Sequence, residues 1–86
     1  MPEISRFFGI IIAMYYKDHA PPHFHARYDG QKAIISIESL SIIEGYLAPR
    51  VLGMVTEWAS AHRGELYEDW KFAQDMKELK PIAPLE

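Results

Sequence analysis

The residues most able to do chemistry are three histidines within seven positions of one another, His19, His23 and His25. Imidazole gains or loses a proton near neutral pH, and the neutral ring is a common metal ligand. Two basic residues follow, Arg27 and Lys32, and such cations bind phosphate and stabilise negative charge. The segment therefore predicts a site for proton transfer, for a metal ion or for phosphate.

The first hypothesis is chemistry on the phosphates of RNA. His23 and His25 would act as acid and base, and Arg27 would stabilise the developing negative charge. No protein nucleophile is needed if the 2′-hydroxyl of RNA attacks the phosphate, so the activity would be that of a histidine-dependent ribonuclease. The residues predicted to contribute to binding are His19, Lys32 and Ser36.

The second hypothesis is a histidine-based metal-binding domain with zinc as the ion. A His-x-His pair on a strand places two imidazoles on one face with their Cβ atoms about 7 Å apart, and His23 and His25 have this spacing. His19 would supply a third ligand, and Glu38 or water a fourth. The chain has no cysteine and no second histidine pair to support this site.

Two further interpretations involve no chemistry. The histidines can lie on a solvated sheet face, where they tolerate water, or on a surface that binds another protein. Hydrophobic residues make up 49% of a chain of only 86 residues, which is more apolar surface than so small a body easily buries. A homodimer or a complex with a small partner protein is therefore expected.

A predicted β-hairpin positions these residues. Two segments of alternating pattern, 23–28 and 31–38, are joined by Asp29-Gly30, a dipeptide that favours a two-residue hairpin turn. This turn places Tyr28 opposite Gln31 and His23 opposite Ser36. Opposed residues share a face, so the polar face gathers His23, His25, Arg27, Lys32 and Ser36, with Glu38 at its edge. The apolar face gathers Phe24, Ala26, Tyr28, Ala33, Ile35 and Ile37.

The remaining pattern predicts an α+β fold in the order β-β-β-β-α-α. Residues 4–16 are β-branched and aromatic and read as one central strand with a bulge or bend at Gly9. A loop at 17–22 and a short strand at 41–44 complete an antiparallel sheet of about four strands. Apolar residues at helical spacing then predict two helices, 49–63 and 65–77, or one kinked helix, packed on one face of the sheet.

Composition restricts the classes of function. The formal charge of −3 is unlike that of a strongly basic nucleic-acid binder, so any contact with RNA must be local. The longest apolar run is too short to cross a bilayer, which takes about 20 residues, so no membrane association is expected. A single domain over residues 1–86 and a cytoplasmic location are the expectations.

Several segments resemble the small bacterial proteins catalogued as domain of unknown function 4160. The resemblance is carried by residues 2–16, by Asp18-His-Ala-Pro-Pro-His-Phe-His-Ala-Arg-Tyr28, by Pro49-Arg50 and by Glu57-Trp58-Ala59. It implies one half of a two-gene module, commonly beside a protein of domain of unknown function 2442, and a toxin–antitoxin pair in which this chain is the toxin. It carries no catalytic residue over to this chain.

Together these observations predict a toxin-like component that binds a small antitoxin-like protein. Its functional surface would be the histidine and basic face described above, acting on RNA. A non-catalytic interaction module and a histidine-based metal-binding domain are the alternatives.

Overall fold

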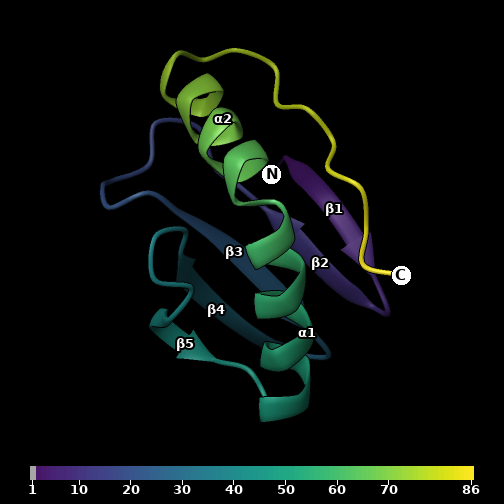
Figure 1. The fold of residues 1–86 in the computed structure, drawn as a ribbon. Helices are drawn as coiled ribbons and strands as arrows, with labels where there is room; N and C mark the ends of the chain where they lie inside the picture. Colours follow the sequence, from purple (N-terminus) through teal and green to yellow (C-terminus); the bar gives the residue numbers. More distant parts are fainter. Residues whose placement is uncertain (1) are drawn as a thin grey trace.

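The structure is a computed structural model that describes residues 2–86. Within these residues, five antiparallel strands form one sheet in chain order, so that each strand pairs with the next. Two helices follow and lie against the sheet (Figure 1). The α+β class and the two C-terminal helices are confirmed, and the sheet has five strands where about four were expected. The elements are β1 (Glu3–Phe7), β2 (Ile10–Ala13), β3 (His23–Tyr28), β4 (Gln31–Ser36), β5 (Ile42–Tyr46), α1 (Pro49–Ala61) and α2 (Arg63–Gln74).

The extra strand arises at Phe8-Gly9, where the expected single strand over 4–16 is wrong. Both residues have positive φ, 50° and 80°, as the central residues of a type I′ hairpin turn require. The chain therefore reverses and forms a hairpin of β1 and β2. The sequence conceals this turn because a bulky side chain is rarely found at positive φ. The segment is consequently an edge strand and its inner neighbour, not one central strand.

The hairpin of β3 and β4 has the register that its sequence predicts. Asp29 and Gly30 form the turn with φ of 46° and 81°. The paired residues are Tyr28 and Gln31, Arg27 and Lys32, His25 and Ile34, and His23 and Ser36. On the opposite face Phe24, Ala26, Ala33, Ile35 and Ile37 are buried. The separation into a polar and an apolar face is therefore confirmed.

The core lies between the apolar sheet face and one side of α1. The stripe of Val51, Val55, Trp58 and Ala59 is buried, and the Trp58 ring lies 5.3 Å from that of Phe7 and 6.0 Å from that of Phe24, between centroids. Helix α1 crosses one face of the sheet in Figure 1, and no helix of the described residues crosses the other face. We refer to that other face as the open face.

The C-terminal segment closes the core along β1. The Ile82 N–H donates to the Ile4 carbonyl oxygen (2.7 Å), and the Trp58 indole N–H donates to the Ala83 carbonyl oxygen (2.8 Å). The yellow segment runs beside β1 in Figure 1, as these bonds require. Across the described part of the chain, no helix has the length and apolar character that a membrane span needs.

Candidate functional site

The predicted polar residues of β3 and β4 lie on the open face, but to different depths. Arg27 and Lys32 are exposed and His25 is partly buried. His23 is only 6% exposed, because the Trp70 ring of α2 packs against it with centroids 5.1 Å apart. The face is thus accessible at its centre and closed at the end where β3 begins.

The loop before β3 adds Asp18, a residue that the spacing of the histidines did not identify. Its Oδ2 lies 2.8 Å from His23 Nε2 and 3.3 Å from His25 Nε2. One ligand atom from each of the three side chains lies within 4.8 Å of the others. We name Asp18, His23 and His25 the Asp-His-His cluster.

The main chain around Asp18 is held from two sides. The His19 N–H donates to Asp18 Oδ1 (2.8 Å), which leaves Oδ2 directed at the histidines. Gln74 Nε2 of α2 donates to the Asp18 carbonyl oxygen (3.1 Å), and the Lys17 N–H donates to the Ala73 carbonyl oxygen (3.2 Å). The C-terminal turn of α2 therefore fixes the loop that supplies the carboxylate.

His23 is the buried histidine of the cluster, and both of its ring nitrogens have partners. Its Nδ1 lies 2.7 Å from the Pro21 carbonyl oxygen, to which it donates, and its Nε2 faces Asp18. Both ring nitrogens are thus engaged and the ring is buried. His23 was predicted as an acid or base, but this placement leaves no ring nitrogen turned toward a ligand on the open face.

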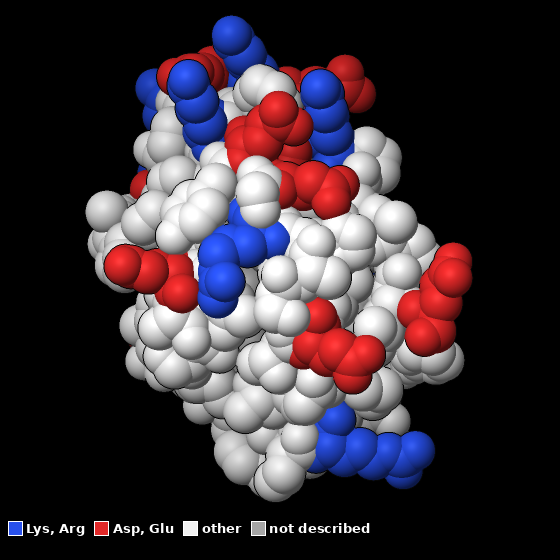
Figure 2. Space-filling view, viewed as in Figure 1, with Lys and Arg blue, Asp and Glu red and all other residues white. Residues whose placement is uncertain are grey.

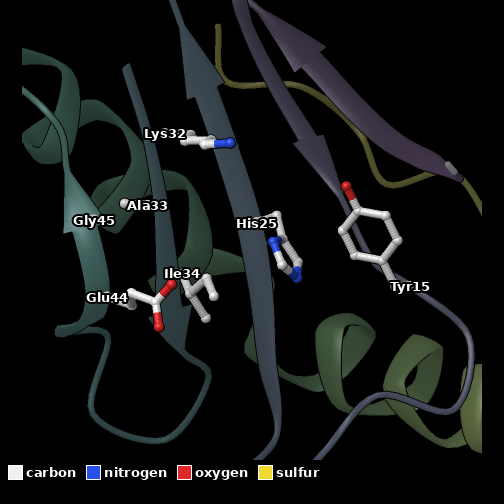
Figure 3. Close-up of a pocket in the computed structure, with 7 residues that line it drawn as sticks. All are labelled: Tyr15, His25, Lys32, Ala33, Ile34, Glu44 and Gly45. Carbon is white, nitrogen blue, oxygen red and sulfur yellow. The ribbon is translucent and has the colours of Figure 1, made fainter. Parts of the chain in front are cut away.

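His25 is the member of the cluster that reaches a hollow of the open face (Figure 3). The hollow has a volume of about 400 Å³. The Tyr15 ring meets the imidazole edge to face, with centroids 4.4 Å apart. The hollow is lined by Tyr15, His25, Lys32, Ala33, Ile34, Glu44 and Gly45.

The surroundings move two pKa values in the same direction. Burial lowers the pKa of His25, against the opposing effect of its hydrogen bond with Asp18. Burial acts to raise the pKa of Asp18, but hydrogen bonds from the His19 N–H and from both histidines outweigh it and hold that pKa below its usual range. The carboxylate is therefore ionised at neutral pH and polarises the imidazole beside it.

Arg27 and Lys32 lie opposite each other beside the hollow. Lys32 lines the hollow and also a second one of about 350 Å³, which Arg27 borders at the turn end of the sheet. Within residues 2–86 neither side chain takes part in a salt bridge. Glu44 lines the far side of the first hollow, so a bound anion would lie on the side of the two cations.

The structure leaves three predicted residues outside the Asp-His-His cluster. His19 contributes its main-chain N–H, and its side chain is exposed. Glu38 is exposed after the end of β4. Ser36 accepts the Ser39 N–H (3.2 Å) and supports that turn. The potential ligands that the described residues bring together are therefore Asp18, His23 and His25, and not the predicted set of His19, His23, His25 and Glu38.

Among the described residues, the opposite face of the molecule carries no second group of potential metal ligands. Figure 2 shows the helix side, where basic and acidic side chains are interspersed. Such a surface gives no broad attraction to a polyanion. The open face is therefore the better candidate site.

One of three comparisons with known proteins gave a match. Neither the curated proteins nor the solved structures gave a significant match. A family model matches residues 9–71, which run from the Phe8-Gly9 turn into α2 and include every residue of the Asp-His-His cluster. The matched region is well over half of the chain. The chain therefore belongs to the family described as Domain of unknown function (DUF4160).

Proposed function

We propose that the open face binds the phosphate backbone of RNA and cleaves it, and that the chain is the toxin-like component of a bacterial toxin–antitoxin module. The observation that carries this proposal is the position of His25. Its ring is held by Asp18 at Nε2, it lines a hollow, and Lys32 lines the same hollow with Arg27 beside it.

The chemistry requires little from the protein. The 2′-hydroxyl of RNA attacks the adjacent phosphorus, the bond to the 5′-oxygen breaks, and a 2′,3′-cyclic phosphate and a 5′-hydroxyl result. Arg27 and Lys32 would hold the phosphate and offset its growing charge. His25 is placed to accept the 2′-hydroxyl proton, directly or through a bound water. The protonated His25 then gives this proton to the leaving 5′-oxygen, directly or through the same water.

The charge of the molecule suits a local contact. The chain has a net charge of −3, and two cations at one end of a hollow would engage one or two phosphates. Binding would then be weak and only moderately salt-dependent, because few counterions are released. We expect a short, flexible RNA segment as the substrate, because one or two contacted phosphates span only a few nucleotides.

The test is growth of bacteria after induction of the wild type, of His25→Ala and of Arg50→Ala at matched levels. Arg50 is an exposed basic residue of α1, away from the open face, and serves as the control. We expect arrest with the wild type and with Arg50→Ala but not with His25→Ala. Purified wild type should release cyclic-phosphate ends from a short RNA, and absence of both arrest and cleavage would refute the proposal.

A second function, binding of a small partner protein, is favoured by β5. This strand pairs with β4 alone, and it carries Ile43 and Tyr46, which are 48% and 60% exposed. An edge strand offers unpaired main-chain groups to which another strand can add. We propose that an antitoxin-like protein or a second copy of the chain binds here.

Co-purification with the product of the neighbouring gene tests this second function. We expect a stable complex with the wild type, or a homodimer in its absence, and loss of either in Ile43→Glu/Tyr46→Glu. A monodisperse monomer that forms no such complex would exclude partner binding.

A further inference from the structure

We infer that the Asp-His-His cluster is a binding site for one divalent transition-metal ion of the zinc type. Three potential ligands converge there: a carboxylate oxygen of Asp18 and imidazole nitrogens of His23 and His25, all within 4.8 Å of one another. Two imidazoles and one carboxylate form a donor set that suits zinc, iron or cobalt, and not magnesium or calcium.

One of the two separations between donor atoms matches that around a coordinated ion, and the other is shorter. Ligand atoms about 2.0–2.2 Å from a tetrahedral zinc ion lie roughly 3.3–3.6 Å from one another. Asp18 Oδ2 lies 2.8 Å from His23 Nε2 and 3.3 Å from His25 Nε2. An ion would therefore require Asp18 Oδ2 and His23 Nε2 to move apart.

The outer contacts are those that orient metal ligands. Ligating histidines usually donate their second ring N–H to a carbonyl or carboxylate oxygen, and His23 Nδ1 lies 2.7 Å from the Pro21 carbonyl oxygen. The His19 N–H holds Asp18 Oδ1, which leaves Oδ2 for an ion. Trp70 packs against His23 and Tyr15 against His25, so both imidazole rings are held in place.

Without a metal ion, the hydrogen bonds of the cluster do not give each polar atom a partner of its own. Asp18 Oδ2 is shared by two imidazole nitrogens, and both nitrogens of His23 face acceptors. A cation placed among Oδ2 and the two Nε2 atoms would satisfy all three donor atoms at once. This need for a shared positive charge is the reason to prefer an ion site to a hydrogen-bonded cluster.

The site keeps a position open. Three protein ligands with a free fourth position are typical of catalytic zinc, whereas structural zinc usually has four. Of the three ligands His25 alone lines the hollow beside Lys32, and the three side chains leave one position of a tetrahedral ion to a water molecule. The inference goes beyond the proposed function: an imidazole of His25 bound to an ion cannot accept the 2′-hydroxyl proton, so a water on the ion would act as the base in its place, and ion binding does not require RNA cleavage.

The test is calorimetric titration of zinc into the full chain, purified without an affinity tag and freed of metal with a chelator. The variants are Asp18→Asn and His25→Ala, with His62→Gln as control, since His62 lies at the junction of α1 and α2 and outside the cluster. We expect one ion per wild-type chain and unchanged binding in the control. Affinity should fall at least about 100-fold in either cluster variant, because even outer contacts are worth roughly 10–100-fold.

Two further readouts keep the test decisive. Cobalt should give visible absorption of a nitrogen- and oxygen-ligated site with the wild type only, and zinc should raise the Tm of the wild type but not of Asp18→Asn. The inference would be overturned if the wild type bound no zinc, or if both cluster variants bound zinc with the affinity of the wild type. Ion binding without RNA cleavage would sustain the metal site and refute the proposed function; arrest by a protein that binds no metal would do the reverse.

Discussion

A single carboxylate oxygen organises the candidate site at the scale of residues. Asp18 Oδ2 faces His23 and His25 together, and the two histidines then differ in role because one is buried against Trp70 and the other borders the hollow. Residues two apart on one strand thus acquire different environments. The cause is α2, which covers only the end of the sheet where β3 begins.

The pairing of Arg27 with Lys32 predicts opposite effects on binding and on stability. Opposed like charges destabilise a sheet by a few tenths of a kcal/mol, so Lys32→Ala should stabilise the fold slightly. The same change removes a phosphate contact, which should weaken binding of a labelled single-stranded RNA and lower the salt slope by about one. Fluorescence anisotropy at two salt concentrations and urea unfolding measure the two effects. Equal RNA affinity in Lys32→Ala and Arg50→Ala would contradict this assignment.

Asp69 predicts a pH dependence of stability that the cluster does not cause. It is 1% exposed, Oδ1 accepts the Lys80 N–H (2.9 Å), and Oδ2 has no partner among the described residues. Burial raises its pKa, against the Lys80 N–H, which lowers it. The folded protein therefore holds this proton more tightly than the unfolded chain, and stability falls as pH rises from about 4 through the folded pKa.

Asp69→Asn should therefore stabilise the protein more at pH 7 than at pH 4, since the amide can still accept the Lys80 N–H. Urea unfolding at the two pH values measures the difference. Glu57→Gln is the matched control, because Glu57 is exposed on α1 and is not among the charges that act on Asp69. An equal change in unfolding free energy at both pH values would show that Asp69 is not the titrating group.

At the scale of elements, two hairpins differ in how well their sequences reveal them. Asp29-Gly30 has the residues that a type I′ turn favours, and the predicted register of β3 and β4 is correct. Phe8-Gly9 adopts the same conformation with Phe8 at positive φ. This turn was not predicted, and the segment was expected to be a single strand. Local turn chemistry was therefore predictable only where the residue types themselves demand the turn.

The pairing of β5 with β4 depends on the absence of a side chain at Gly45. Its φ is 93°, and a Cβ there would overlap the Lys32 carbonyl oxygen and lie 2.9 Å from Ala33 Cα. Both neighbours are main-chain atoms of β4, so Gly45→Ala should force the strands apart and cost at least about 2 kcal/mol. Gly53→Ala in α1, where no atom lies near the added Cβ, should instead stabilise by about 0.5–1 kcal/mol.

Urea denaturation of the two glycine variants compares these changes. The opposite signs make each variant a control for the other. Similar losses of stability in both would mean that the packing of β5 on β4 is looser than the structure shows.

At the scale of the whole molecule, the two helices cover one face of the sheet, and α2 also positions part of the candidate site on the open face. Helix α2 holds the loop at Asp18 through Gln74, a contact between residues 56 positions apart. Strand alternation predicted the layers and the face of His23 and His25. It could not predict Asp18 or the burial of His23, because both depend on where a loop and a distant helix meet.

Loss of the C-terminal segment should remove a large part of the free energy of unfolding. A chain of 86 residues is stabilised by roughly 4–13 kcal/mol in total. Deletion of residues 81–86 exposes the core beside Ile82 and removes the acceptor of the buried Trp58 indole. Burial of such a side chain is worth about 1.5–3 kcal/mol, and a lost partner for a buried donor costs about 1–3 kcal/mol. The deletion should therefore lower the urea midpoint sharply.

Two single variants divide this effect. Ile82→Ala should reproduce the loss of burial. Trp58→Phe removes the indole donor, so deletion of 81–86 should cost less stability in Trp58→Phe than in the wild type. Deletion of the exposed Glu86 alone should leave the midpoint unchanged. Urea unfolding followed by circular dichroism compares these proteins. If the deletion of 81–86 unfolds no earlier than that of Glu86, the segment does not close the core, and α1 alone must protect the apolar face of β1.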